Sequence, residues 1–210
     1  MEKFETLSGV AASMPLENIN TDAIIPVSWI VNYGRDLGQG LFGGWRYDQT
    51  GNENPTFVLN QPPNRAARIL IAGQNFGCGS SREEAVWALL GFGIRCVIAP
   101  SFGDIFYENA FKNSLLPLRM AQEDIDALTR DPAFAAGARL TVDLQSCRVS
   151  VPSGSNGIGF SIEDSRRAAL LAGLDHIDLS LQHAPATAAF QASDRERRPW
   201  IYARGPHTEG

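Results

Sequence analysis

The stretch RILIAGQNFGCGSSREEAVWALLGFG, residues 68–93, decides the expected fold. It opens with a short apolar run at 68–72, which suits a strand buried on both faces. A loop at 73–79, too rich in glycine for regular structure, follows this run. From Ser81 the apolar side chains recur at the spacing of one buried helix stripe. They are Ala85, Ala88, Leu89 and Phe92. The order strand, loop, helix predicts the first half of a βαβ unit.

The next segments repeat this alternation of strand and helix. Residues 96–99 are predicted to form a second strand, and residues 104–112 a second helix. A third strand is expected at 115–118. Pro117 lacks the N–H that a ladder requires, so we place this strand at an edge of the sheet.

The second half of the chain predicts a different kind of pairing. Apolar residues alternate with period two over 140–144 and again over 147–151, which indicates an antiparallel pair. A helix is expected at 162–172. The sequence therefore predicts an α/β domain with a mixed, partly parallel sheet over residues 1–193, and a solvated C-terminal tail over 194–210.

Composition and charge exclude several classes of protein. The chain is 44% hydrophobic and 20% charged, as expected of a globular domain. Its 18 basic and 23 acidic residues give a net charge of -5, and the basic residues are dispersed, which argues against sequence-independent binding of nucleic acid. The acidic start and the lack of an apolar stretch of ~18 residues predict a cytoplasmic protein without a membrane span.

The cysteines argue against a metal centre within this chain. Cys78, Cys96 and Cys147 are widely spaced and include no Cys-x-x-Cys pair. This spacing predicts neither a disulfide framework nor a self-contained zinc or iron–sulfur site. Any metal chemistry would have to use something supplied from elsewhere.

Residues 80–83, Ser-Ser-Arg-Glu, are the candidates for chemistry. They lie where the glycine-rich loop meets the predicted helix, whose unpaired N–H groups and dipole favour an anion. Arg82 offers a planar fork that matches a carboxylate, and a Ser80 alkoxide stabilised beside these donors could act as a base. Spacing alone leaves an alternative open. Ser81 with Glu84 forms a capping box, so that the serines would only cap the helix, at about 1 kcal/mol each.

Several segments resemble the swivelling domain of the aconitase superfamily. Residues 73–83 are similar to that domain's central motif, and residues 20–26, Asn-Thr-Asp-Ala-Ile-Ile-Pro, to the segment that opens it. Later segments at 98–106, 111–113 and 171–175 are similar as well, so the resemblance covers most of the chain. It implies a swivelling β/β/α domain of aconitase type. In length and layout the chain is most similar to the small subunits of isopropylmalate dehydratases.

This resemblance implies an activity shared between two chains. The small subunit would serve a hydro-lyase that interconverts 2-isopropylmalate and 3-isopropylmalate by dehydration and rehydration in leucine biosynthesis. A [4Fe-4S] cluster carried by a large partner subunit would act as Lewis acid on the carboxylate substrate, and this chain would bind no metal. By position in the motif, Ser80 would be the catalytic base, Asp22 a second catalytic residue, and Ser81 and Arg82 substrate ligands. From the residues alone, Asp22 could equally be an Asx cap in a turn.

Two features bear on the substrate. Glu84 stands where the family usually has histidine, which leaves open a related hydratase acting on citraconate, dimethylmaleate or a homoaconitate-like acid, or a non-catalytic carboxylate-binding assembly module. Residues 27–47 are the expected specificity segment. There Trp29, Ile30 and Val31 would form an apolar wall that suits a branched isopropyl group, unless they are ordinary core.

Overall fold

The computed structural model describes residues 3–31, 36–132, 134, 139–152 and 157–202. Two compact units make up the chain, residues 1–173 and residues 174–210. The expected boundary between residues 193 and 194 lies inside helix α11 (Ala184–Arg197), so the start of the predicted solvated tail is the last turn of a helix. Among the described helices, none is long and apolar enough to cross a membrane.

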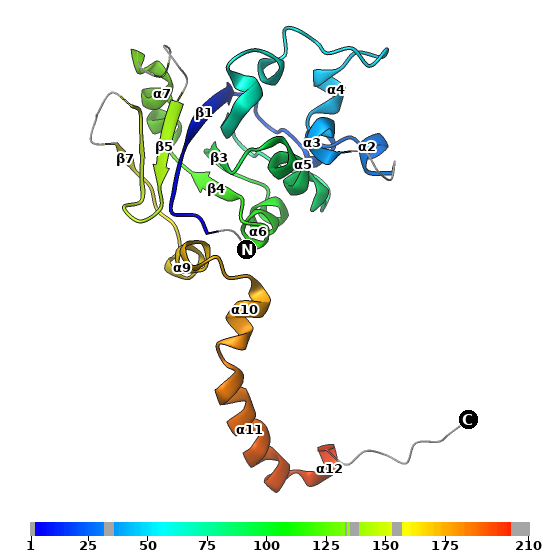
Figure 1. Ribbon diagram of the computed structural model, residues 1–210, viewed down its shortest axis with the longest axis vertical. Helices are drawn as coiled ribbons and strands as arrows, with labels where there is room; N and C mark the ends of the chain where they lie inside the picture. The colour runs from blue at the N-terminus through cyan, green and yellow to red at the C-terminus, as the bar shows by residue number, and fades with distance from the viewer. Residues whose placement is uncertain (1–2, 32–35, 133, 135–138, 153–156, 203–210) are drawn as a thin grey trace. The chain divides into compact units, whose positions relative to one another are not determined.

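The first unit is built on one mixed sheet (Figure 1). Its strands within the described residues are β1 (Thr6–Met14), β2 (Ala67–Ala72), β3 (Cys96–Ala99), β4 (Leu116–Arg119), β5 (Arg139–Asp143), β6 (Arg148–Ser150) and β7 (Ile158–Gly159). They lie in the order β4-β3-β2-β1-β5-β6-β7. Strands β1 to β4 pair in parallel, whereas β5, β6 and β7 join antiparallel. The predicted mixed sheet is confirmed, and β4 lies at its edge as Pro117 indicated.

Helices and short turns connect the strands. The unit contains α1 (Thr21–Ile24), α2 (Val27–Val31), α3 (Leu37–Gly40), α4 (Gly43–Arg46), η1 (Val58–Asn60), η2 (Asn64–Ala66), α5 (Glu84–Phe92), α6 (Asp104–Lys112), α7 (Gln122–Arg130) and α9 (Asp164–Ala172). The second unit contains α10 (His176–Leu181), α11 and α12 (Pro199–Tyr202). The helices predicted at 104–112 and near 162–172 are confirmed.

Strand β2 is buried on both faces, as its composition predicted. Leu70 belongs to one hydrophobic cluster with Phe76, Leu89 and Phe106, on the face covered by α5 and α6. Ile69 and Ile71 belong to a second cluster on the other face, which includes residues of β3, β5 and α7. This double burial holds β2, and the loop that leaves its carboxyl end, in a fixed place.

Candidate active site

The site forms where two parallel strands end side by side. Met14, the last residue of β1, is in register with Ala72, the last residue of β2, so the segments that follow both strands leave the same edge of the sheet. Backbone hydrogen bonds then join them. The Gly77 N–H donates to the Ile19 carbonyl at 2.7 Å. The carboxyl edge of parallel strands is where open α/β sheets commonly bind ligands.

The glycine-rich loop can follow this path only because it lacks side chains at key points. Gly77 has φ +73°, and a Cβ on it would overlap the ring of Phe106. Gly79 has φ +91° and lies against Asn20. A Cβ on Gly103 would lie 2.6 Å from the Gly77 carbonyl oxygen. Side chains at these positions would be strained or would clash, so the glycines set the position of residues 80–82.

Thr21 connects the opening segment to the loop at two points. Its N–H donates to the Cys78 carbonyl at 3.0 Å, and its hydroxyl donates to the Ser80 carbonyl at 3.0 Å, across 59 residues of sequence. Thr21 is only 1% exposed, so its hydroxyl needs a hydrogen-bond partner within the protein, and the Ser80 carbonyl is that partner. The sequence alone does not indicate a role for Thr21, because its hydroxyl contacts a residue far along the chain that only the topology brings close.

Asp22 and Arg82 form an ion pair above this contact. Oδ1 of Asp22 lies 2.6 Å from Nη1 of Arg82, and the aspartate side chain is 52% exposed. The pair is close, but its direction is not that of a hydrogen bond, and among the described residues the buried Nη1 has no hydrogen-bond acceptor. Arg82 is therefore held by charge and keeps donor capacity for another carboxylate. Asn20, not Asp22, caps α1, since its side chain accepts from the Ala23 N–H at 2.8 Å.

The capping alternative for the two serines is wrong. Helix α5 begins at Glu84, three residues later than predicted, and its N-cap residue, Glu83, makes no side-chain capping bond. Ser80 and Ser81 lie before the helix and are exposed. Because the helix end is further along the chain, the case for an anion beside Ser80 depends on Arg82 more than on the helix dipole.

The three residues of the predicted apolar wall lie in different surroundings on α2. Trp29 stacks on Tyr47 at 5.8 Å, and a Cβ on Gly43 would lie 2.5 Å from its Nε1, so the indole fits closely against α4. Ile30 also packs against the core. Val31 is 64% exposed. Of the three side chains, Val31 is largely accessible to a substrate, whereas Trp29 and Ile30 are only partly accessible.

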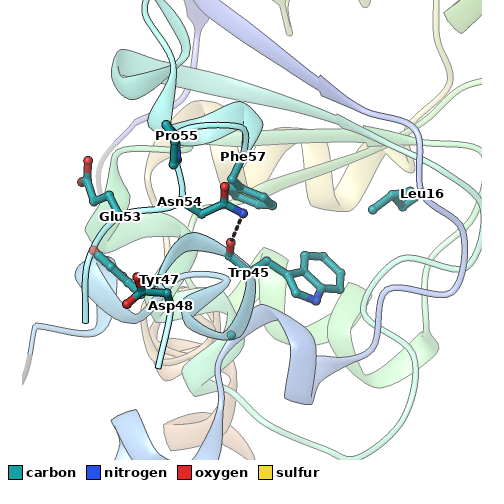
Figure 2. Close-up of a pocket in the computed structure, with 9 residues that line it drawn as sticks. Leu16, Trp45, Tyr47, Asp48, Glu53, Asn54, Pro55 and Phe57 are labelled. Atoms are coloured by element: carbon teal, nitrogen blue, oxygen red, sulfur yellow. Dashed lines mark hydrogen bonds between the residues drawn. The ribbon is translucent and has the colours of Figure 1, made fainter. Parts of the chain in front are cut away.

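A hollow of about 630 Å³ is lined by residues of α4 and of the segment that follows it (Figure 2). Leu16, Trp45 and Phe57 give it apolar walls, and Asp48 and Glu53 give it an acidic rim. Hydrogen bonds from the Thr50 hydroxyl and neighbouring N–H groups lower the pKa of Asp48, and the Arg65 guanidinium lowers the pKa of Glu53. A second hollow of about 310 Å³ shares Leu16 and Trp45 and reaches Asn20 and Ala23, which flank the Thr21–Asp22 pair. No motif in the sequence indicated either hollow.

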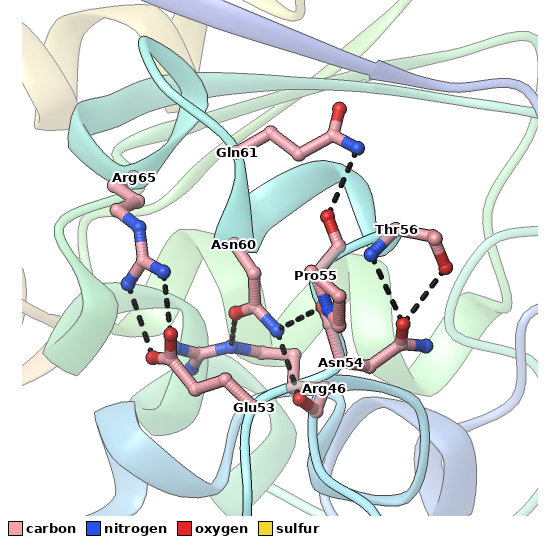
Figure 3. A network of polar contacts seen from close by, with 8 residues as sticks. All are labelled: Arg46, Glu53, Asn54, Pro55, Thr56, Asn60, Gln61 and Arg65. Atoms are coloured by element: carbon pink, nitrogen blue, oxygen red, sulfur yellow. Dashed lines mark hydrogen bonds and ion pairs between the residues drawn. The ribbon is translucent and has the colours of Figure 1, made fainter.

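A buried arginine fixes the wall of the larger hollow (Figure 3). Arg46, 6% exposed, donates from Nε to the Asn60 side-chain oxygen at 3.0 Å. The Asn60 amide in turn donates to the backbone carbonyls of Arg46 and Asn54 at 2.8 and 2.9 Å. Arg65 and Glu53 form an ion pair nearby. These bonds tie α4 to η1 and so position Trp45 and Tyr47.

The described residues do not fit a metal cluster. Cys96 is buried within β3, and burial raises the pKa of its thiol far above the usual range. Cys78 and Cys147 are partly buried. Among the residues that the structure describes, no three His, Cys, Asp or Glu side chains come together to hold a metal ion. A cluster carried by a partner subunit stays a prediction.

Comparison with known proteins gives the family. The family model described as the aconitase C-terminal domain matches residues 1–123, well over half of the chain. The chain belongs to this family. Relatives named 3-isopropylmalate dehydratase small subunit extend the similarity further. That of Dinoroseobacter shibae is 54% identical over 96% of this chain, and that of Brucella canis 51% identical over 95%, each matched along its full length.

A solved structure is similar in fold to this chain. A crystal structure of a 3-isopropylmalate dehydratase from Methanocaldococcus jannaschii aligns with a TM-score of 0.62 at 25% identity. The alignment covers 88% of this chain and 98% of that one. The resemblance to the aconitase-type swivelling domain, and to the isopropylmalate dehydratase small subunits within it, is thereby confirmed.

Proposed function

We propose that this chain is the small subunit of a 3-isopropylmalate dehydratase, a hydro-lyase that interconverts 2-isopropylmalate and 3-isopropylmalate in leucine biosynthesis. The observation that carries the proposal is the ion pair of Asp22 and Arg82, which brings together two motif segments far apart in sequence. The names of relatives at 51–54% identity support it. A cytoplasmic location belongs to the same proposal.

The chain's own residues bind the substrate and move its proton. Arg82 binds one carboxylate, and its ion pair with Asp22 keeps the guanidinium beside the loop that carries Ser80. Ser80 Oγ, as an alkoxide beside this cation, takes the proton from the carbon next to that carboxylate, and the electron pair of the C–H bond forms the alkene as the hydroxyl leaves the adjacent carbon. Ser81 contributes a hydrogen bond to the substrate. In rehydration, Ser80 Oγ gives its proton to the carbon that had carried the hydroxyl, and the hydroxide that had left adds to the carbon that had lost the proton, so that hydrogen and hydroxyl exchange places and Ser80 is again an alkoxide.

The remaining functions are assigned to a partner. In this proposal a large subunit would carry the [4Fe-4S] cluster, which would supply a Lewis acid for the substrate's hydroxyl. The described residues of this chain bring together no group of ligands for a metal. The two chains form a heterodimer. The exposed Ser80 and Ser81 would then be covered by the partner, which excludes bulk water from the reaction.

Reconstitution tests the proposal. The chain is purified anaerobically with its large subunit and assayed on 2-isopropylmalate, citraconate, dimethylmaleate and homoaconitate. We expect the highest kcat/KM for isopropylmalate. A complex that prefers one of the other acids would make the chain a subunit of a related hydratase, and a complex that binds but converts none of them would make it a carboxylate-binding module.

A further inference from the structure

Arg82 is followed directly in sequence by a carboxylate, Glu83, that could compete with the substrate. A glutamate next to an arginine can neutralise it, and the guanidinium would then bind a second carboxylate less well. In the structure Glu83 does not pair with Arg82. Among the described residues, the carboxylate in ion-pair contact with Arg82 is that of Asp22.

The Glu83 carboxylate is bound by Asn113 instead. Nδ2 of Asn113 donates to Oε1 of Glu83 at 2.7 Å, across 30 residues of sequence. Glu83 is the N-cap residue of α5 and Asn113 the C-cap residue of α6, so the bond joins the ends of two helices whose places are fixed by the core (Figure 1). Both side chains are partly buried. A hydrogen bond to a charged group contributes more free energy in such a place than in water.

The Asn113 amide is held in one orientation. Its Oδ1 accepts from the Trp87 indole N–H at 3.0 Å, and its Nδ2 also donates to the Asn109 carbonyl at 2.9 Å. An indole N–H can only donate and a backbone carbonyl can only accept. The amide NH₂ group is therefore directed to Glu83, and a flipped amide would lose all three contacts.

We propose that Asn113 is a positioning residue that keeps the Glu83 carboxylate away from Arg82, so that Arg82 is left to bind the substrate carboxylate. The inference rests on the proposed function for its consequence in catalysis. Asn113 itself touches no reacting atom. Its removal frees Glu83 to turn toward the neighbouring cation, and substrate then has to displace an internal carboxylate.

Kinetics of the reconstituted complex test this role. Asn113→Ala should raise KM for isopropylmalate about tenfold and change kcat little, because Arg82 contacts the carboxylate in ground and transition states alike. The double variant Asn113→Ala/Glu83→Gln should restore KM to within about twofold of the wild type, since a neutral glutamine cannot compete for Arg82. Asn109→Ala is the matched control, because its backbone carbonyl rather than its side chain joins the network.

A structural readout separates this inference from the proposed function. In a crystal structure of the Asn113→Ala chain, the Glu83 carboxylate should lie within 4 Å of the Arg82 guanidinium. If Glu83 keeps its wild-type place there, or if the double variant stays as impaired as Asn113→Ala, the positioning role is wrong. A wild-type complex without activity on isopropylmalate would instead overturn the proposed function and leave the crystallographic result to decide the role of Asn113.

Discussion

At the scale of single residues, the structure bears on two alternative roles of Ser80 and Ser81, a role in catalysis and a role in capping helix α5. Both uses were compatible with the sequence, because Ser-x-x-Glu is a capping signature and also part of the family motif. The later start of α5 removes the capping use. Ser80 is instead located by its own carbonyl, which accepts from the buried Thr21 hydroxyl. A hydroxyl placed in this way, outside any helix, is available to act on a substrate.

Replacing Ser80 by alanine should therefore affect turnover and not stability. We expect kcat of the complex to fall by roughly 10²- to 10⁴-fold, the usual contribution of a general base, with the melting temperature of the chain unchanged. Ser165→Ala, on α9, is the control and should change neither quantity. A Ser80→Ala chain that melts earlier but turns over normally would return the serine to a structural role.

At the scale of elements, the short helix α2 has one side chain packed against the core and another exposed to solvent. Trp29 fits closely against glycines of α3 and α4, where a Cβ on Gly40 would lie 2.9 Å from the indole. Such a position is typical of core packing. Val31, two residues later in the same short helix, is largely exposed. If α2 selects the substrate, Val31 is the residue of the predicted wall best placed to do so, and Ile30 contributes less.

An arginine on α2 should change the substrate preference. Val31→Arg supplies a cation for the additional carboxylate of a tricarboxylic acid, whose burial without a partner costs several kcal/mol. We expect the ratio of kcat/KM for the tricarboxylic acid over isopropylmalate to rise about tenfold or more, and Ile30→Arg to shift it less. Val31→Gln, similar in length but neutral, should leave the ratio near the wild-type value. An unchanged ratio in Val31→Arg would remove α2 from substrate selection.

At the scale of the whole molecule, the sequence predicted the part of the sheet with strong periodicity and missed its central strand. Strands β2, β3 and β4 and their helices follow from apolar runs and glycine-rich joints. Strand β1, TLSGVAASM, has small residues where a buried strand usually has β-branched ones. Its Gly9 is needed because a Cβ there would lie 2.9 Å from the Cβ of Arg68. Close packing, which favours small residues, concealed the strand.

Strand β1, which the sequence did not predict, also explains which features of the site could be predicted and which could not. Ser80, Arg82 and Asp22 were predicted from the motif and its resemblance. The ion pair of Asp22 with Arg82 depends on β1 and β2 being parallel neighbours that end in register, a property of the whole sheet. For the same reason the contacts of Thr21 and Asn113 could not be predicted, since each crosses between elements that only the fold brings together.

The proposed division of metal chemistry between two chains also concerns the whole molecule, and the cysteines test it. Cys96 lies buried in β3, and Cys78 and Cys147 belong to a loop and a turn in different parts of the fold. If a partner carries the cluster, the variant Cys78→Ala/Cys147→Ser should assemble with the large subunit and, after reconstitution, show the wild-type iron content and iron–sulfur absorbance. Cys96→Ala keeps a small apolar side chain in the core and should behave alike, apart from a loss of stability of about 1 kcal/mol from the lost sulfur packing. The isolated wild-type chain, incubated anaerobically with iron and sulfide and then desalted, should retain no iron–sulfur absorbance. Loss of iron from the complex of any cysteine variant that still assembles would place a cluster ligand on this chain, and the two-chain division would have to be abandoned.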